Sequence, residues 1–232
     1  MTELQALTES EFSRRLGKFW SAELSADLLQ KLCAHYEELR RWAATLALIG
    51  PGAVGELFER HYAESLAALA WLPCSASKPG APAVRLLDLG SGAGFPGWIL
   101  AAARPDIEVT LVEARERKWA FLSTAARRAR LSCRCLNARV SPRSLADVPD
   151  RSERIDLQGP IAVVTVRALR LEAKTWLALL PHLGPGAQVL LWSGAVAEPP
   201  PPPYVAGRTL ALSGSHRFLR EYRLPSGLQG TE

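Results

Sequence analysis

The chain has 232 residues, of which 48% are hydrophobic and 22% charged, so it can bury one sizeable core but is too short for two full α/β domains. Its 28 Lys and Arg residues exceed its 23 Asp and Glu residues and give a net charge of +5, which suits a polyanionic partner without proving one. No apolar stretch has the length of a membrane span, no secretory leader is recognisable, and the four cysteines lack the C-x-x-C spacing of zinc or thioredoxin-like sites, so we expect a cytoplasmic protein with reduced thiols and no bound metal.

The N-terminal part of the chain has the pattern of amphipathic helices. Thr8 and Glu11 have the spacing of a capping box, in which each side chain binds a backbone amide at the start of a helix. Apolar residues then recur at steps of three and four at Leu28, Leu32, Tyr36, Leu39 and Trp42, as one buried helix face requires. After a Gly-Pro-Gly break at 50–52, a further helix is predicted to carry Leu57, Phe58, His61, Ser65, Leu66 and Leu69. We therefore predict a helical cap over residues 1–75.

The pattern changes after residues 75–82, which are rich in Ser, Pro, Gly and Ala and read as a linker. Beyond it, strands are expected at 84–89, 108–113, 133–138, 161–166 and 188–192, and helices at 98–103, 118–130 and 171–180. This alternation requires crossover connections, so it predicts a doubly wound, mainly parallel α/β sheet with helices on both faces. The runs 209–212 and 218–224 are expected to pair as antiparallel strands at the sheet edge through a turn at 213–215. We place the catalytic core in residues 76–232.

A glycine-rich turn follows the first of these strands. Gly90, Gly92 and Gly94 let backbone amides approach a ligand without a Cβ in the way, ahead of a helix N-terminus. Glu113 ends the second strand, where an acid can accept hydrogen bonds from both hydroxyls of an unphosphorylated ribose. Sites for NAD and S-adenosylmethionine share this acid, but the G-x-G-x-G spacing differs from the dinucleotide fingerprint, and Asp88 precedes the loop. The residues predict a nucleotide cofactor and favour S-adenosylmethionine over a dinucleotide.

The residues around this loop resemble those of the small-subunit ribosomal RNA methyltransferase G family, also called glucose-inhibited division protein B. The distinctive part is DLGSGAGFPG at 88–97, in which Pro96 and Gly97 continue beyond the three glycines. Further matches are ARPD at 103–106, LVEA at 111–114, KWAFL at 118–122, NARV at 137–140, VRA at 166–168 and, in the cap, RW at 41–42 and RHYAESL at 60–66. Two departures are Ala43 and Ala44 in place of asparagines, and Ser193 in place of the lysine of a Lys-Gly pair.

The resemblance implies a Rossmann-like class I methyltransferase with a seven-stranded, mostly parallel sheet and an N-terminal helical cap. It implies S-adenosyl-L-methionine as the cofactor and N7 of a guanine in 16S ribosomal RNA as the methyl acceptor. The cofactor-binding residues that it implies are Gly90, Phe95, Val140, Ser141 and Arg167, and the ribose argument adds Glu113. We expect 16S ribosomal RNA or the small ribosomal subunit as the partner, no membrane association and a monomer.

The implied reaction sets modest demands on the protein. Guanine N7 carries a free lone pair, so it can attack a sulfonium methyl group without a general base, and no dedicated catalytic residue is expected. Arg167 ends the fourth strand and is predicted to reach the cofactor and guanine pocket. Arg139 is a hypothesis for a phosphate contact. His61 is a hypothesis for a site residue in the cap, although a lone His on an apolar helix face more often makes a buried hydrogen bond.

Two alternatives remain open. A small-molecule methyltransferase would close the cap over a dry apolar pocket, and a non-catalytic RNA-binding or assembly factor would keep the fold without the activity. Clustered basic residues favour RNA because they supply phosphate contacts and arginine stacks on unpaired bases. The clusters lie at 14–18, 40–41, 115–118, 127–134, 167–174 and 217–223.

Overall fold

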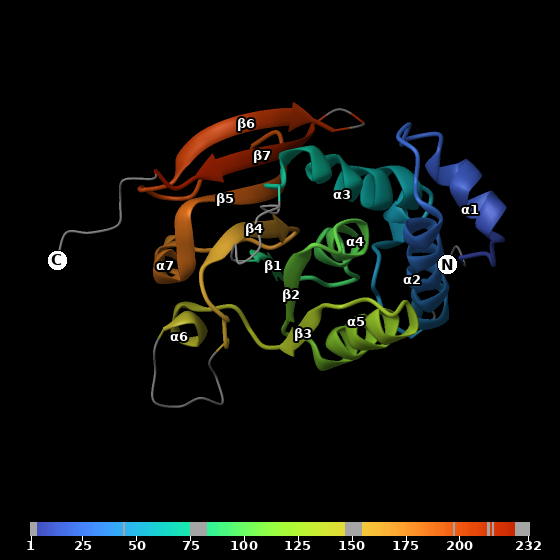
Figure 1. Cartoon of the computed structure of the whole chain (residues 1–232), viewed down its shortest axis with the longest axis horizontal. Coiled ribbons are helices and arrows are strands. Elements are labelled where there is room, and N and C mark those ends of the chain that lie inside the picture. Colours follow the sequence, from blue (N-terminus) through green and yellow to red (C-terminus); the bar gives the residue numbers. More distant parts are fainter. Residues whose placement is uncertain are drawn as a thin grey trace.

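The computed structural model describes residues 4–43, 45–74, 83–146, 155–196, 198–212, 214 and 216–225. In this part of the chain, seven strands form one sheet in the order β3-β2-β1-β4-β5-β7-β6. The first five strands are parallel, and β7 runs antiparallel to both of its neighbours, β5 and β6 (Figure 1). The predicted doubly wound, mostly parallel, seven-stranded sheet is confirmed, and so is the antiparallel pair at its edge.

The strands are β1 (Val84–Leu89), β2 (Ile107–Glu113), β3 (Arg134–Asn137), β4 (Ile161–Arg167), β5 (Leu183–Gly194), β6 (Val205–Ala211) and β7 (Arg217–Arg223). The α-helices are α1 (Glu9–Leu16), α2 (Ala26–Ala43), α3 (Glu64–Leu66), α4 (Gly97–Ala103), α5 (Glu116–Arg128), α6 (Pro142–Leu145) and α7 (Ala173–Leu179). Four helical segments are not α-helical: the π-helix η2 (Leu57–Ala63) and the 3₁₀ segments η1 (Pro51–Ala53), η3 (Ala67–Trp71) and η4 (Leu180–His182). The predicted elements are present; Ser213 and Ser215 of the predicted edge turn lie outside the described residues.

One strand is longer than its sequence indicates. Strand β5 begins at Leu183, although the prediction began at residue 188 because Gly184 and Pro185 break the apolar run. Leu183 pairs with Ile161, and the register of the β4–β5 ladder then shifts between Ile161 and Val163. An irregularity of this kind accommodates glycine and proline in a strand.

The sheet separates two hydrophobic clusters because successive side chains of a strand point to opposite faces. Leu86 of β1 belongs to the cluster that includes α4, α5 and the N-terminal helices, whereas its neighbour Leu87 belongs to the cluster that includes α6 and α7. Figure 1 shows α2, α4 and α5 on one side of the sheet and α6 and α7 on the other. The N-terminal helices therefore complete one of the two helical layers.

Aromatic packing holds the helices of the cap together, and Trp42 of α2 packs edge-on against Phe121 of α5. The predicted capping box of Thr8 and Glu11 starts α1, and Phe12 of that helix packs edge-on against Tyr36, Phe58 and Tyr62. The boundary predicted between residues 75 and 76 lies outside the described residues, so the division into two units stays a prediction.

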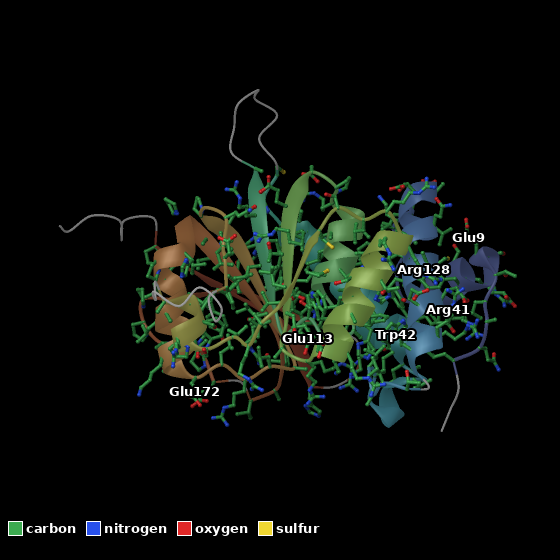
Figure 2. All side chains as sticks on the ribbon, turned by 90° about the horizontal axis from the view of Figure 1, so that it is seen from below. Glu9, Arg41, Trp42, Glu113, Arg128 and Glu172 are labelled. Atoms are coloured by element: carbon green, nitrogen blue, oxygen red, sulfur yellow. The ribbon has the colours of Figure 1, made fainter. Side chains whose placement is uncertain are left out.

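A buried glutamate also ties α2 to α5. Glu38 accepts hydrogen bonds from Arg41 at 2.9 Å and from the indole of Trp42 at 3.3 Å, and it pairs with Arg128 of α5 at 2.8 Å. Figure 2 shows Arg41, Trp42 and Arg128 together at this contact between the two helices, at a distance from Glu113. The cap is therefore anchored on α5 by charge as well as by apolar packing.

The helix predicted after residue 52 is not a regular α-helix. Its first part, Leu57–Ala63, is a π-helix, and it continues through α3 into the 3₁₀ segment η3. The hydroxyl of Ser65 donates a 2.6 Å hydrogen bond to the carbonyl oxygen of His61, inside the irregular turn. Side-chain bonds of this kind compete with the helix ladder, and π-turns are frequent at functional sites.

Gly97 explains why the glycine loop continues beyond its three glycines. This residue begins α4 directly over the buried carboxyl of Asp88 at the end of β1. A Cβ at position 97 would lie 2.5 Å from Cβ and Cγ of Asp88, closer than carbon atoms can approach. The absence of a side chain therefore lets α4 pack onto β1 and directs the loop outward.

We expect Gly97→Ala to destabilise the protein because α4 or Asp88 must shift. Overpacking of this kind costs about 1–3 kcal/mol, which corresponds to a fall of roughly 2–12 °C in Tm for a chain of this size. Thermal unfolding followed by circular dichroism measures it. Gly55→Ala is the matched control, because a Cβ there has no neighbour within 4 Å; equal Tm values for the two variants would contradict this explanation.

Candidate active site

The carboxyl ends of β1, β2 and β4 open into a cavity of about 440 Å³. This is the edge where open α/β sheets bind ligands, and the volume suits a nucleoside-sized molecule. Five of the six residues predicted to bind the cofactor line it: Gly90, Phe95, Glu113, Val140 and Arg167. The sixth, Ser141, does not line it. Its hydroxyl accepts a hydrogen bond from the backbone N–H of Ser144 and caps α6.

The floor of the cavity is the glycine loop. The backbone N–H groups of Gly90 and Ser91 donate to the carbonyl oxygen of Val112 at 2.9 and 3.0 Å, which holds the loop against the end of β2. Gly90 has φ +74°, and a Cβ on it would lie 3.0 Å from Cδ2 of Leu169. Both the left-handed backbone and the close approach favour glycine at this position.

Glu113 lies at the end of β2 near the first turn of α5 (Figure 2). Its Oε2 accepts a hydrogen bond from the backbone N–H of Gly92 at 2.9 Å, and its Oε1 accepts one from the N–H of Arg115 at 2.8 Å. These two bonds fix the carboxylate, which is only 7% exposed. Each oxygen keeps a second lone pair, so both can still accept hydrogen bonds from a diol.

Arg167 enters the cavity from the end of β4 and is held by the cap. Its Nη2 donates to the carbonyl oxygen of Arg60 and, at 3.0 Å, to the carboxylate of Glu64. Burial lowers the pKa of Arg167 to about 10, while the nearby Glu64 raises it, so the guanidinium stays charged at neutral pH. Its Nη1 is shielded from solvent and has no hydrogen-bond partner among the described residues. A ligand with an acceptor group would supply that partner.

Glu64 was not predicted as a site residue, although it lies in the cap motif at 60–66. Its side chain is 3% exposed and pairs with two arginines, Arg167 of β4 and Arg217 of β7, the latter at 2.8 Å. Burial raises the pKa of Glu64, and the two arginines oppose this shift. The cap and core motifs thus meet in one buried ion pair. The presence of both motifs, at 60–66 and 166–168, was the one sign of this pair in the sequence. Their contact could not be predicted because it forms only in the folded protein.

His61 lies on η2 and also lines the cavity, with its ring 4.9 Å from that of Phe95. Neither of its ring nitrogens is exposed or has a hydrogen-bond partner among the described residues. His35, which is fully buried, differs from the half-buried His61: its Nδ1 bonds to the hydroxyl of Tyr62 at 2.8 Å and its Nε2 to the carbonyl oxygen of Ala93 at 2.9 Å. A buried polar group left unpaired costs about 1–3 kcal/mol, so the nitrogens of His61 call for a partner.

Positive residues surround the mouth of the cavity. Arg115, Lys118 and Arg139 line it, and Arg115 and Arg139 are exposed.

Two positions depart from the family's residues. At the first, Ser193 of β5, Arg220 of β7 donates to the serine hydroxyl and, at 2.8 Å, to the carbonyl oxygen of Gly194. A cation therefore stands beside Ser193. At the second departure, where the family has asparagines, Ala43 ends α2 and Ala44 lies outside the described residues.

Comparisons with known proteins agree with this geometry. The family model described as rRNA small subunit methyltransferase G matches residues 28–199. The chain belongs to this family. A ribosomal RNA small subunit methyltransferase G from Jannaschia sp. is 41% identical over 57% of this chain and 63% of its own length. One from Myxococcus xanthus is 34% identical over 87% of this chain and 84% of its own length.

A solved structure of a putative methylase from Haemophilus influenzae is similar in fold, with a TM-score of 0.50 and 16% identity over 70% of this chain and 88% of that one. Family membership confirms the predicted resemblance. No helix within the described ranges is long and apolar enough to cross a membrane. In the same ranges, no three His, Cys, Asp or Glu side chains are grouped so that they could hold a metal ion.

We expect His61→Leu to make the protein less sensitive to acid. Burial, and then the positive charge of Arg167, lower the pKa of His61 to about 3 from its ordinary 6.5. The unfolded chain therefore binds a proton that the folded protein excludes, and stability falls as pH drops from about 6.5 toward 3. At pH 5 this loss is roughly 2 kcal/mol, or about 4–8 °C in Tm.

The Tm of His61→Leu should therefore fall less than that of the wild type between pH 7 and pH 5, and at pH 7 it should be equal or higher because an unpaired polar group is removed. His35→Leu is the control, since it loses the bonds to Tyr62 and Ala93 and should unfold earlier at pH 7. A wild-type pH dependence of Tm in His61→Leu would show that His61 does not have the assigned environment.

Proposed function

We propose that the protein transfers a methyl group from S-adenosylmethionine to N7 of a guanine in 16S ribosomal RNA, as a cytoplasmic monomer acting on the RNA or the small ribosomal subunit. The observation that carries this proposal is the cavity in which the glycine loop, Glu113 and Arg167 meet at the carboxyl edge of the sheet. The names of the relatives, which specify ribosomal RNA of the small subunit, support the substrate.

The lining residues fit the cofactor in polarity and charge. The fixed carboxylate of Glu113 would accept hydrogen bonds from both ribose hydroxyls, and Gly90 and Phe95 would contact the nucleoside. The unpaired Nη1 of Arg167 would donate to the carboxylate of the methionine part. Val140, which lines the cavity, would close its other side, and Ser141 would act indirectly by starting α6 beside it.

The chain's own residues have little covalent chemistry to perform. The cofactor supplies an electrophilic methyl group on a sulfonium, and guanine N7 brings a lone pair and no proton to remove. The protein binds the two reactants, aligns them and excludes water, and such alignment can supply roughly 7–11 kcal/mol of the barrier. A deep floor formed by buried residues of the glycine loop is suited to that task.

The charge around the cavity favours RNA over a small neutral substrate. Arg115, Lys118 and Arg139 stand at its mouth, where phosphates flanking a flipped-out guanine would pass. Phosphate contacts by several cations make affinity fall steeply with added salt. A dry apolar pocket sealed by the cap would have favoured the small-molecule alternative.

We expect the purified protein to transfer labelled methyl groups from S-adenosylmethionine to small ribosomal subunits, or to their RNA, taken from cells that lack this protein. Nuclease digestion and mass spectrometry of the product should identify 7-methylguanosine at one position. Incorporation should decline as salt is raised. Absence of label in both substrates, with cofactor binding intact by calorimetry, would refute the RNA substrate and leave the cofactor assignment standing.

Two glutamates on β2 provide a test of the ribose contact and its matched control. Glu113→Ala should weaken cofactor binding about 10- to 100-fold because two hydrogen bonds to a charged group are lost. Glu108→Ala should leave binding unchanged, since Glu108 lies at the opposite end of the same strand, 58% exposed and paired with Arg85. Equal binding by the two variants would contradict the ribose role of Glu113.

A further inference from the structure

The two nitrogens of His61 are the feature of the cavity that cofactor binding does not use. The ring of His61, which belongs to η2, lies against the ring of Phe95, with the two centroids 4.9 Å apart and the planes tilted by 36°. Both nitrogens lack partners among the described residues, whereas both nitrogens of His35, in the same layer, have them. A buried polar group that stays unpaired beside a ligand cavity points to a partner that arrives with the ligand.

The residues around His61 indicate which kind of hydrogen-bonding group its partner carries. Burial, and then the positive charges of Arg167, Arg60 and Arg217, lower the pKa of His61 and keep its imidazole neutral. A neutral imidazole has one N–H donor and one acceptor nitrogen, whereas a guanidinium has donors only. The carboxylate of Glu64 is already paired with Arg167 and Arg217. The acceptor nitrogen of His61 therefore differs from the arginine donors and from the paired carboxylate of Glu64, because it can still accept a hydrogen bond on the cap side of the cavity.

We propose that His61 is a specificity-determining residue, whose acceptor nitrogen receives a hydrogen bond from the N1–H or 2-amino group of the target guanine; this inference rests on the proposed function. When N7 faces the methyl group, the opposite Watson–Crick edge of the base remains for the protein to read. RNA-binding proteins read unstacked bases on this edge. At positions N1 and C2 guanine presents an N–H and an amino group, whereas adenine has an unprotonated N1 and no 2-amino group, which would leave the acceptor nitrogen unpaired.

The tilted contact with Phe95 fits the same role. Phe95 belongs to the loop that forms the floor of the cavity, and its ring packs edge-on against Tyr62 as well as against His35. His61 is thus positioned by a ring that is itself fixed from two sides. Such support keeps an acceptor in one place, which discrimination between bases requires.

The test compares wild type, His61→Asn and His61→Leu on small subunits that carry guanine or adenine at the mapped target position. We expect His61→Leu to lower kcat/KM on guanine about 10- to 100-fold, the effect of one lost hydrogen bond that leaves a buried base group unpaired. Asparagine keeps a donor and an acceptor, so His61→Asn should retain activity within about fivefold of wild type. The preference of His61→Leu for guanine over adenine should narrow accordingly.

Cofactor affinity by calorimetry separates the outcomes. The inference predicts that both variants bind S-adenosylmethionine within about twofold of wild type, since a single hydrogen bond to the base does not reach the cofactor. Full activity of His61→Leu on guanine, or a loss of cofactor affinity that accounts for the loss of activity, overturns the role of His61 alone. A wild type that binds the cofactor but methylates neither RNA nor subunits overturns the proposed function as well.

Discussion

The buried carboxylate of Glu64 is the constraint on which the site depends. It pairs with Arg167 at 3.0 Å and with Arg217 at 2.8 Å. The backbone carbonyl oxygen of Glu64 accepts a hydrogen bond from the indole N–H of Trp192 at 3.1 Å. One residue of the cap therefore holds β4, β5 and β7 together at the edge where the cavity opens. Removing one partner from a buried ion pair leaves an uncompensated charge and is strongly destabilising.

This arrangement makes the cap part of the cavity wall. The floor of the cavity comes from the glycine loop of the core, but the guanidinium of Arg167 is oriented by Glu64 and the carbonyl of Arg60. His61 comes from the π-helical segment that ends next to Glu64, and it lines the cavity itself. In the proposed function, the core would supply the contacts to the cofactor's nucleoside, and the cap would supply groups near the reacting atoms.

Much of this was predictable because it depends on local patterns. Strand β1 coincides with its predicted bounds, since an apolar run ends in glycines that cannot continue a strand, and Glu113 could be placed at the cavity from strand direction alone. What could not be predicted depends on tertiary contacts. The partner of Arg167 lies 103 residues away in the sequence, Arg220 reaches Ser193 only through the β5–β7 ladder, and Ser141 caps a helix too short to be recognised from its sequence.

The central claim is that Glu64 acts on the cofactor through Arg167, and a double-mutant cycle tests it most directly. S-adenosylmethionine affinity would be measured by calorimetry for Glu64→Gln, Arg167→Lys and the double variant, with Glu38→Gln as the control because Glu38 is an equally buried glutamate paired with two arginines outside the cavity. The account predicts that each single variant weakens binding about tenfold and the double variant hardly further, a coupling of about 1.4 kcal/mol, while Glu38→Gln binds normally. Independent effects that multiply in the double variant, or equal weakening by Glu38→Gln, would contradict it.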